Sequence, residues 1–183
     1  MELVVPDLAY LDAYADALRR GWSPDNIRLE MTAREELAKI AADPVAFVAS
    51  LDDREAKGGP ITLPDGSKAA RLPGFRRWIW DGTFCGSIGL RWQPGTALLP
   101  SHVLGHIGYA VVPWKRGRGY ATQALALMLE EARREGLPYV ELTADPDNEA
   151  SQKVIRANGG VLVERFEAPA YGKEELRFRV ALD

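Results

Sequence analysis

The sequence has little of what several classes of protein need. Its 183 residues include one cysteine, Cys85, and two histidines. A single cysteine excludes an internal disulfide, and so few thiol and imidazole groups exclude the clustered ligands of a structural zinc site. We therefore expect a reducing, cytoplasmic location and no bound metal. Cys85 falls inside a strand pattern, which predicts a small buried side chain rather than a nucleophile.

Net positive charge and long apolar runs are also missing. The chain has 23 Lys+Arg against 26 Asp+Glu, so we expect neither nucleic acid nor an anionic membrane as a partner. No apolar run approaches the ~20 residues of a membrane helix, and the N-terminus lacks the basic start and apolar core of a signal peptide. With 46% hydrophobic residues, the chain can build a real core in one domain that spans residues 1–183.

Helix signals fill the beginning of the chain. Asp7 is typical of a residue that caps a helix. Thr32 with Glu35 forms a capping box, which predicts a second helix that starts at Thr32. Asp43 followed by a proline indicates the start of a third helix. A short strand is expected before these helices, at residues 2–5.

Strand patterns dominate the rest of the chain. Asp81 and Gly82 separate two runs of aromatic and β-branched residues, which is the strongest short signal for a β-hairpin. The tryptophans around this hairpin, Trp78, Trp80 and Trp92, are expected in the sheet core. Further strands are expected at 106–112, 137–144, 161–167 and 176–182, and further helices begin near residues 120 and 148. This order predicts a mixed α/β fold with helices flanking a sheet.

The most unusual stretch is VVPWKRGRGYA, residues 111–121, which places three cations and two glycines directly before a helix. The start of a helix presents unpaired N–H groups and the positive end of the helix dipole, and glycines let a ligand approach closely. We therefore expect an anionic ligand at Gly117 and Gly119, which interleave with Arg116 and Arg118. An ordinary solvated turn is the alternative that the loop alone leaves open.

Two known phosphate-binding patterns do not fit this stretch. The P-loop requires Gly-Lys-Ser/Thr, which the sequence lacks. The dinucleotide fingerprint requires Gly or Ala three residues after its second glycine, and Thr122 stands there when the count starts at Gly119. A third pattern, (Gln/Arg)-x-x-Gly-x-(Gly/Ala), fits Arg116, Gly119 and Ala121. With the strand before it and the helix after it, the stretch resembles the coenzyme A-binding motif of the GNAT superfamily of N-acetyltransferases.

The resemblance is specific from His106 to Phe166 and architectural elsewhere. It implies a mixed, mostly antiparallel GNAT-like sheet with a splayed central strand pair. It also implies that acetyl-CoA lies with its pantetheine arm along the strand before the loop and its pyrophosphate on the loop amides. The implied cofactor-binding residues are Val111, Val112, Arg116, Gly117, Arg118, Gly119, Tyr120, Ala121, Thr122, Asn148 and Ser151. Asn148 is explained almost as well as the N-cap of its helix.

Transfer of an acetyl group to an amine calls for a base and an acid. The first candidate for the base is His106, because an unperturbed histidine pKa of about 6.5 suits proton transfer near neutrality, although a purely structural role is the alternative. Glu141 is the second candidate, and Tyr109 is the third, as an acid or a substrate-orienting group. Many members of the superfamily carry a tyrosine acid at the position of Ile155, so another group must supply that proton here.

The implied function is an acetyl-CoA-dependent N-acetyltransferase that acts on a primary amine by direct attack on the thioester. The acceptor, a small molecule or a peptide, is unknown. A catalytically weak coenzyme A-binding sensor or interaction domain is the alternative, supported by Ile155, and a longer acyl donor stays open. Acceptor pockets in the superfamily come from variable loops, here 21–32 and 53–73, with the hairpin tryptophans as a further candidate lining. A homodimer is common in the superfamily.

Overall fold

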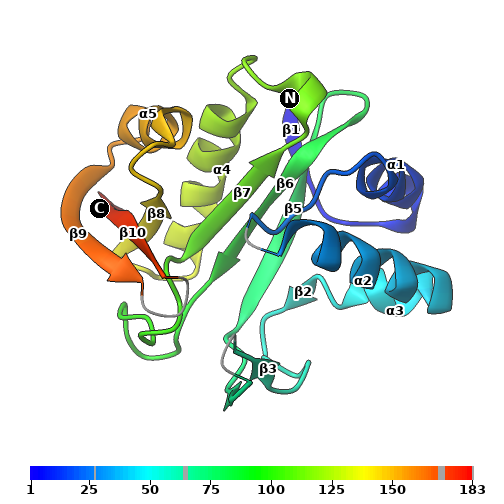
Figure 1. Ribbon diagram of the computed structural model, residues 1–183, viewed down its shortest axis with the longest axis horizontal. Helices are drawn as coiled ribbons and strands as arrows, with labels where there is room; N and C mark the ends of the chain where they lie inside the picture. Colours follow the sequence, from blue (N-terminus) through cyan, green and yellow to red (C-terminus); the bar gives the residue numbers. More distant parts are fainter. Residues whose placement is uncertain (27, 64–65, 169–171, 183) are drawn as a thin grey trace.

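A computed structural model describes residues 1–26, 28–63, 66–168 and 172–182 (Figure 1). Within these ranges, every helix is too short or too polar to span a bilayer. In chain order, the elements are β1 (Glu2–Val4), α1 (Leu8–Arg19), α2 (Leu29–Ala42), α3 (Pro44–Ala49), β2 (Asp52–Asp53), β3 (Ile61–Thr62), β4 (Lys68–Ala69), β5 (Gly74–Trp80), β6 (Phe84–Arg91), β7 (Ile107–Val111), the 3₁₀ turn η1 (Pro113–Lys115), α4 (Tyr120–Arg134), β8 (Tyr139–Ala144), α5 (Glu149–Ala157), β9 (Val161–Ala168) and β10 (Lys173–Ala181).

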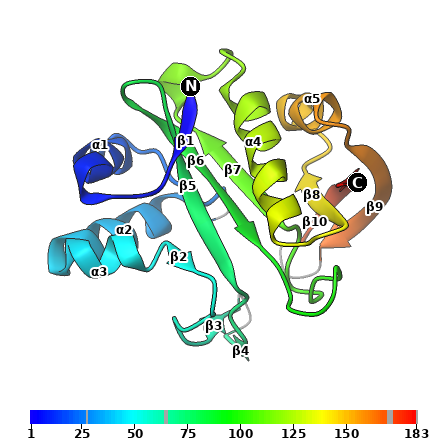
Figure 2. The ribbon, with the colours of Figure 1, turned by 180° about the vertical axis from the view of Figure 1, so that it is seen from behind.

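The main strands form two sheets. The first has the order β1-β5-β6-β7 with antiparallel neighbours, and β2 pairs with the start of β5. The second has the order β8-β10-β9 and is also antiparallel, while β3 and β4 pair separately. In Figure 1 the first sheet runs between α4 on one side and α1, α2 and α3 on the other, and Figure 2 shows α4 and α5 from behind. This arrangement confirms the expected mixed, mostly antiparallel fold.

Apolar side chains pack on both faces of the first sheet. On the α4 side, Leu125 and Met128 join residues of both sheets, including Ile88 and Phe178, in one cluster of buried side chains. On the other side, Tyr14 of α1 stacks on the fully buried Trp78, with ring centroids 4.7 Å apart. Trp78 therefore belongs to the core, as the hairpin pattern predicts. The buried Cys85 also confirms its predicted place among the core residues.

Local signals place two of the first three helices correctly. Asp7 accepts a hydrogen bond from the N–H of Ala9 at 2.9 Å, and Asp43 caps α3 in the same way. The capping box predicted at Thr32 is wrong, because α2 begins one turn earlier, at Leu29. The N-cap is Arg28, which makes no side-chain cap bond, and the hydroxyl of Thr32, inside the helix, donates to the carboxylate of Asp25 at 3.2 Å.

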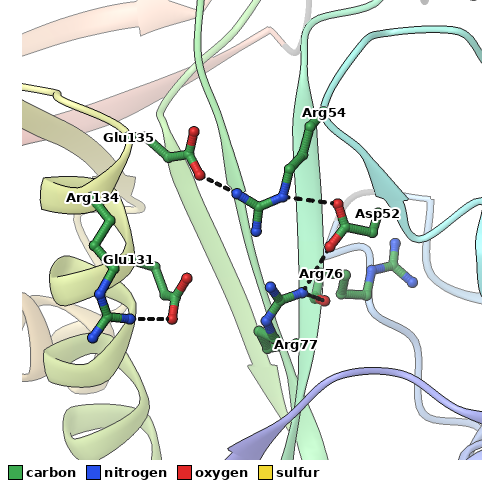
Figure 3. Close-up of polar contacts among 7 residues, drawn as sticks. All are labelled: Asp52, Arg54, Arg76, Arg77, Glu131, Arg134 and Glu135. Atoms are coloured by element: carbon green, nitrogen blue, oxygen red, sulfur yellow. Dashed lines mark hydrogen bonds and ion pairs between the residues drawn. The ribbon is translucent and has the colours of Figure 1, made fainter.

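Ion pairs connect the end of α4 to the segment around β2 (Figure 3). Asp52 accepts from Nε of Arg54 at 3.0 Å and from Nη1 of Arg77 at 3.2 Å. Arg54 also donates to Glu135, which directly follows α4. Such partly exposed pairs contribute little stability one by one, but together they attach the C-terminal end of α4 to the N-terminal part of the fold. The other end of α4, where the glycine-arginine loop enters, points away from these pairs.

Candidate active site

The two sheets meet where β7 begins. The backbone N–H of His106 donates to the carbonyl of Glu141 at 2.7 Å, and the N–H of Glu141 donates to Nδ1 of His106 at 2.9 Å. Gly105 makes this approach possible, because a Cβ there would lie 2.9 Å from the carbonyl oxygen of Glu141. Past this junction β7 and β8 belong to different sheets. We call the region between them, from the junction to Val111 and Ala144, the splay, and it confirms the expected splayed strand pair.

The edge of β7 that faces the splay is contacted by side chains. Because antiparallel pairing alternates, the N–H of Val112 bonds to Cys85 in β6 at 2.9 Å, whereas Tyr109 and Val111 turn their backbone groups the other way. The carbonyl of Tyr109 accepts from Nδ2 of Asn26 at 3.5 Å, and that of Val111 accepts from Nε of Arg116 at 3.3 Å. A backbone edge occupied only by side chains can pair with an extended ligand.

The glycine-arginine loop leads from the splay into α4. Gly117 and Gly119 both have φ of +75°, a left-handed backbone conformation that residues other than glycine rarely adopt. Arg116 and Arg118 are exposed. The first turn of α4, which begins at Tyr120, supplies backbone N–H groups that have no partner within the helix. Exposed cations, a turned backbone and a helix start therefore lie together, an arrangement that suits an anionic ligand.

Lys115 does not join this position, although it precedes the loop. Its ammonium group bonds to the carboxylate of Asp81 at 2.5 Å, in the turn between β5 and β6. The hydroxyl of Tyr120 also donates to Asp81, at 2.5 Å. These hydrogen bonds from Lys115 and Tyr120 hold the pKa of Asp81 well below its usual range. Asp81 thus connects Lys115 and Tyr120, at the two ends of the glycine-arginine loop, to the turn of the hairpin.

The start of α5 forms the opposite side of the splay. Asn148 is the N-cap of this helix, because its Oδ1 accepts from the N–H of Ser151 at 3.0 Å. The hydroxyl of Tyr109 reaches across from β7 and lies 2.8 Å from Oγ of Ser151. Burial raises the pKa of Tyr109. Ile155, one turn further along α5, is fully buried in the core.

His106 is fully buried at the junction of the two sheets. Its Nδ1 accepts the N–H of Glu141, so the neutral ring carries its proton on Nε2, which is also buried. Burial lowers the pKa of His106. The ring is therefore neutral near pH 7 and serves as a hydrogen-bond acceptor for the neighbouring strand.

The side chain of Glu141 lies on the face of the second sheet that is turned away from the core. Val140 and Leu142 on either side of it are buried, which confirms the alternation expected along this strand. Its carboxylate accepts from Nη2 of Arg179 at 2.6 Å and lies 3.7 Å from Nε of Arg177. The charge of Glu141 is thus held between two guanidinium groups of β10.

The structure places His106, Tyr109, Val111 and Ser151 at the splay, whereas Glu141 turns its side chain to the outer face and residues 116–122 lie in the loop and helix start that follow. Both backbone groups of Val112 are used inside the fold, since its N–H bonds to Cys85 and its carbonyl accepts from Lys115. Sequence reasoning missed Gly105, Asp81 and the two arginines of β10. Asp81 carried only a turn signal, and the alternating positions of Arg177 and Arg179 indicated a shared sheet face but no partner on it.

Residues 18–161 match the family model described as an acetyltransferase (GNAT) domain. Compared by sequence with the curated proteins, the chain matches none. Solved structures similar to the chain include RimJ of Mycobacterium smegmatis in complex with CoA-disulfide (TM-score 0.65, 19% identity, 98% of this chain and 85% of that one). They also include the microcin self-immunity acetyltransferase MccE with acetyl-CoA and AMP (0.63, 12%, 98% and 91%) and RimL, a ribosomal α-N-protein acetyltransferase, with coenzyme A (0.63, 14%, 98% and 92%). At these identities the likeness establishes the fold.

Proposed function

The chain belongs to the GNAT acetyltransferase family, and from that premise we propose that it transfers the acetyl group of acetyl-CoA to a primary amine. The amine nitrogen attacks the thioester carbonyl directly, a C–N bond forms, the C–S bond breaks, and the thiolate takes a proton. The observation that carries this proposal is the continuity between the splay and the glycine-arginine loop. A strand edge and an anion-binding helix start lie one after the other, as an extended ligand that ends in phosphates requires.

The residues present suit acetyl-CoA. Val111 offers backbone groups to the pantetheine arm, and the backbone from Arg116 to Thr122 offers N–H groups to the pyrophosphate. The exposed guanidinium groups of Arg116 and Arg118 add charge at the same place. Amides on the splayed edge of β7 are candidates to stabilise the negative charge that develops on the carbonyl oxygen.

We place the proton donor for the thiolate at Tyr109 and Ser151. The hydroxyls lie 2.8 Å apart, that of Tyr109 on β7 and that of Ser151 on α5, and burial raises the pKa of Tyr109, so it keeps its proton near neutral pH. A thiol has an unperturbed pKa of about 8.5, below that of a phenol, so the proton transfer is uphill and is completed when the phenolate takes a proton back from solvent. The pair would take the role that a tyrosine at Ile155 has in many members of the family.

The base is proposed on the other face of the splay. His106 was the first candidate, but a buried ring whose Nδ1 already accepts a hydrogen bond supports a positioning role better than proton transfer. Glu141 lies at the same junction, and its side chain is 14% exposed on the outer face. Because Arg179 and Arg177 take up the charge of this carboxylate, water at this face is the proton acceptor that the geometry favours.

A second function is supported by Ile155. A domain that binds acetyl-CoA but transfers its acetyl group slowly, as a sensor would, needs the donor site and no dedicated acid. Ile155 has an aliphatic side chain with no proton to donate, so this function depends on whether Tyr109 and Ser151 replace the missing acid.

Calorimetric binding of acetyl-CoA, followed by thioester turnover with a panel of primary amines, tests the proposal. The key variant carries Arg116→Glu and Arg118→Glu, which place negative charge at the pyrophosphate position without altering the glycines. The matched control carries Arg133→Glu and Arg134→Glu at the opposite end of α4, where Arg134 pairs with Glu131 (Figure 3). Both variants change the net charge by the same amount, and thermal unfolding shows that each is folded.

Three outcomes decide between the functions. Binding by the parent and the control, loss in the key variant and turnover with an amine support the transferase. The same binding pattern without turnover on any amine supports the sensor. Absence of binding by the folded parent overturns both, because the glycine-arginine loop would then be an ordinary solvated turn.

A further inference from the structure

Two arginines stand side by side next to the junction of the sheets, on the face away from α4 and α5. Arg179 lies directly opposite Glu141 in the pairing of β10 with β8, and Arg177 lies opposite Thr143. Their neighbours Phe178 and Val180 are buried in the core, so both arginine side chains project from the outer face. The side chain of Arg179 is 44% exposed and that of Arg177 is 27% exposed.

Both guanidinium groups are held in place by an aromatic ring and a carboxylate. Cζ of Arg179 lies 4.1 Å from the ring centroid of Tyr139, and Cζ of Arg177 lies 4.3 Å from that of Phe166. Glu141 bonds to Arg179, and Glu164 accepts from Nη1 of Arg177 at 2.6 Å. An arginine stacked in this way has lost much of its freedom before a ligand arrives, which lowers the entropic cost of binding.

Donors remain on these groups after the contacts within the protein. A guanidinium carries five N–H donors, and the hydrogen bonds from described residues involve Nε and Nη2 of Arg179 and Nη1 of Arg177. Nη1 of Arg179 and Nη2 of Arg177 are not used in those bonds. The carboxylates of Glu141 and Glu164 balance the charges of the two guanidinium groups, so the site offers an anion these unused N–H donors and not an excess of positive charge.

The position of the arginines relates them to the reaction proposed above. The backbone of Glu141 forms the junction with His106, so its side chain begins at the closed end of the splay. The glycine-arginine loop and α5 supply the donor side, on the face covered by α4 and α5 (Figure 2). An amine that attacks the thioester from the opposite side would pass Glu141 and its two arginines.

We propose that the acceptor carries an anionic group, a carboxylate or a phosphate, a few bonds from its amine, and that Arg179 and Arg177 bind this group. Glu141 acts as the internal counter-charge that orders the guanidinium groups before the acceptor arrives. This inference rests on the proposed function and deepens it, because it names the acceptor class. A polyamine, which brings only positive charge to this face, is a poor acceptor on the same grounds.

Matched pairs of amines test the proposal. Glycine and other α-amino acids are compared with their amides, and O-phosphoethanolamine with ethanolamine. Because removal of the anion also changes the pKa of the amine, kcat/KM is expressed per free amine. We expect kcat/KM to favour the anionic member by about 10-fold or more, as a charge-assisted hydrogen bond gives. The two sets of pairs also distinguish a carboxylate from a phosphate.

Variants then assign the preference to the arginines. Arg179→Gln should remove most of the preference through a higher KM for the anionic amines, with little change for the neutral ones, and Arg179→Lys should restore part of it. Arg165→Gln is the matched control, since Arg165 forms a similar ion pair with Glu174 but points to the other face of the same sheet. Equal kcat/KM for both members of every pair, or an equal loss for both in Arg179→Gln, overturns the inference.

A second readout keeps this inference separate from the proposed function. The protein saturated with coenzyme A is titrated with N-acetylglycine and with N-acetylglycinamide. Tighter binding of the carboxylate that is lost in Arg179→Gln supports the arginine site even if no amine in the panel is turned over. Equal binding of the two compounds overturns it. Failure to bind acetyl-CoA at all overturns the transferase and the sensor, and the two compounds are then titrated on the protein without coenzyme A.

Discussion

Tyr109 and Ser151 join the two sides of the splay through hydroxyl groups 2.8 Å apart, one on β7 and one at the start of α5. Their contact brings a proton donor close to the place where a thiolate would leave. It also connects β7 of the first sheet to α5, at a point beyond the backbone junction of the two sheets.

Tyr109→Phe removes the proposed proton donor and leaves the ring. We expect kcat to fall by about 10-fold or more, with the Kd of acetyl-CoA unchanged, because general acid catalysis typically contributes at least that much. Steady-state kinetics and calorimetry on the same protein measure both values. Ser151→Ala should give a smaller loss, since it removes only the partner hydroxyl. An unchanged kcat in Tyr109→Phe would remove this residue from the chemistry.

Protonation of His106 should make the free energy of unfolding depend on pH. Burial lowers its pKa in the folded protein, so the unfolded chain binds the proton first. The contribution of His106 is complete above the unfolded value of about 6.5 and is lost as the pH falls through the lower folded value. Urea unfolding from pH 7.5 to 5 should show this loss, and His106→Asn should flatten it. A pH profile with the same slope in the variant contradicts the assignment.

A structural role and a catalytic role of His106 predict different effects of its substitution. His106→Ala leaves the N–H of Glu141 without its acceptor, which should cost about 1–3 kcal/mol of unfolding free energy. If His106 only positions the junction, kcat between pH 6 and 9 keeps the shape of the parent profile in a folded His106→Asn protein. If the fall in kcat at the acidic end of the parent profile is missing in that variant, His106 is the base.

Asp81→Asn should loosen the glycine-arginine loop. The substitution removes the charge that Lys115 and Tyr120 bond to, and hydrogen bonds to charged groups contribute about 1.5–3 kcal/mol each. Because the folded pKa of Asp81 is lowered, its contribution is present above the unfolded value near 4 and is lost as the pH falls below it. We expect weaker acetyl-CoA binding at pH 7 by calorimetry. Binding as tight as in the parent would show that the loop holds its shape alone.

Arg76 of β5 forms hydrogen bonds to α1 and α2, and we expect these bonds to stabilise this layer. Its Nη1 donates to Tyr14 and to Glu36, at 3.0 Å each, and the hydroxyl of Tyr14 donates to Glu36. Arg76→Leu leaves Glu36 buried without its partner, which should cost about 3–5 kcal/mol in urea unfolding. Tyr14→Phe should cost about 2 kcal/mol, because two hydrogen bonds of about 1 kcal/mol each are lost and the ring stack remains. Similar losses in both variants would contradict this order.

The sequence was most informative where local signals and long patterns agreed. The Asp81 turn, the strand alternation around Glu141 and the positive-φ glycines of the loop all lie where residue types alone predict them. The start of α2 was misplaced because Asp25, a loop residue, competes with the capping box at Thr32. Whether Thr32 caps a helix or bonds to Asp25 depends on where Asp25 lies in the fold, and the spacing of residues in the sequence does not encode that position.

The chemistry of the site was harder to predict than its location. The ordinary pKa of a histidine favours His106 as the base, and only the fold shows that its ring is buried and already bonded to β8. The arginines at positions 177 and 179 gained meaning only when β10 was seen to pair with the strand of Glu141. The cytoplasmic location and the homodimer stay predictions.

Gly105 sets the angle between the two sheets. A methyl group there would lie 2.9 Å from the carbonyl oxygen of Glu141, so the two strands would have to move apart at the junction. A small rotation of β7 about this point becomes a larger displacement of the strand at Val111. Gly105→Ala, which changes none of the proposed ligand contacts, should therefore widen the splay and weaken the binding of acetyl-CoA.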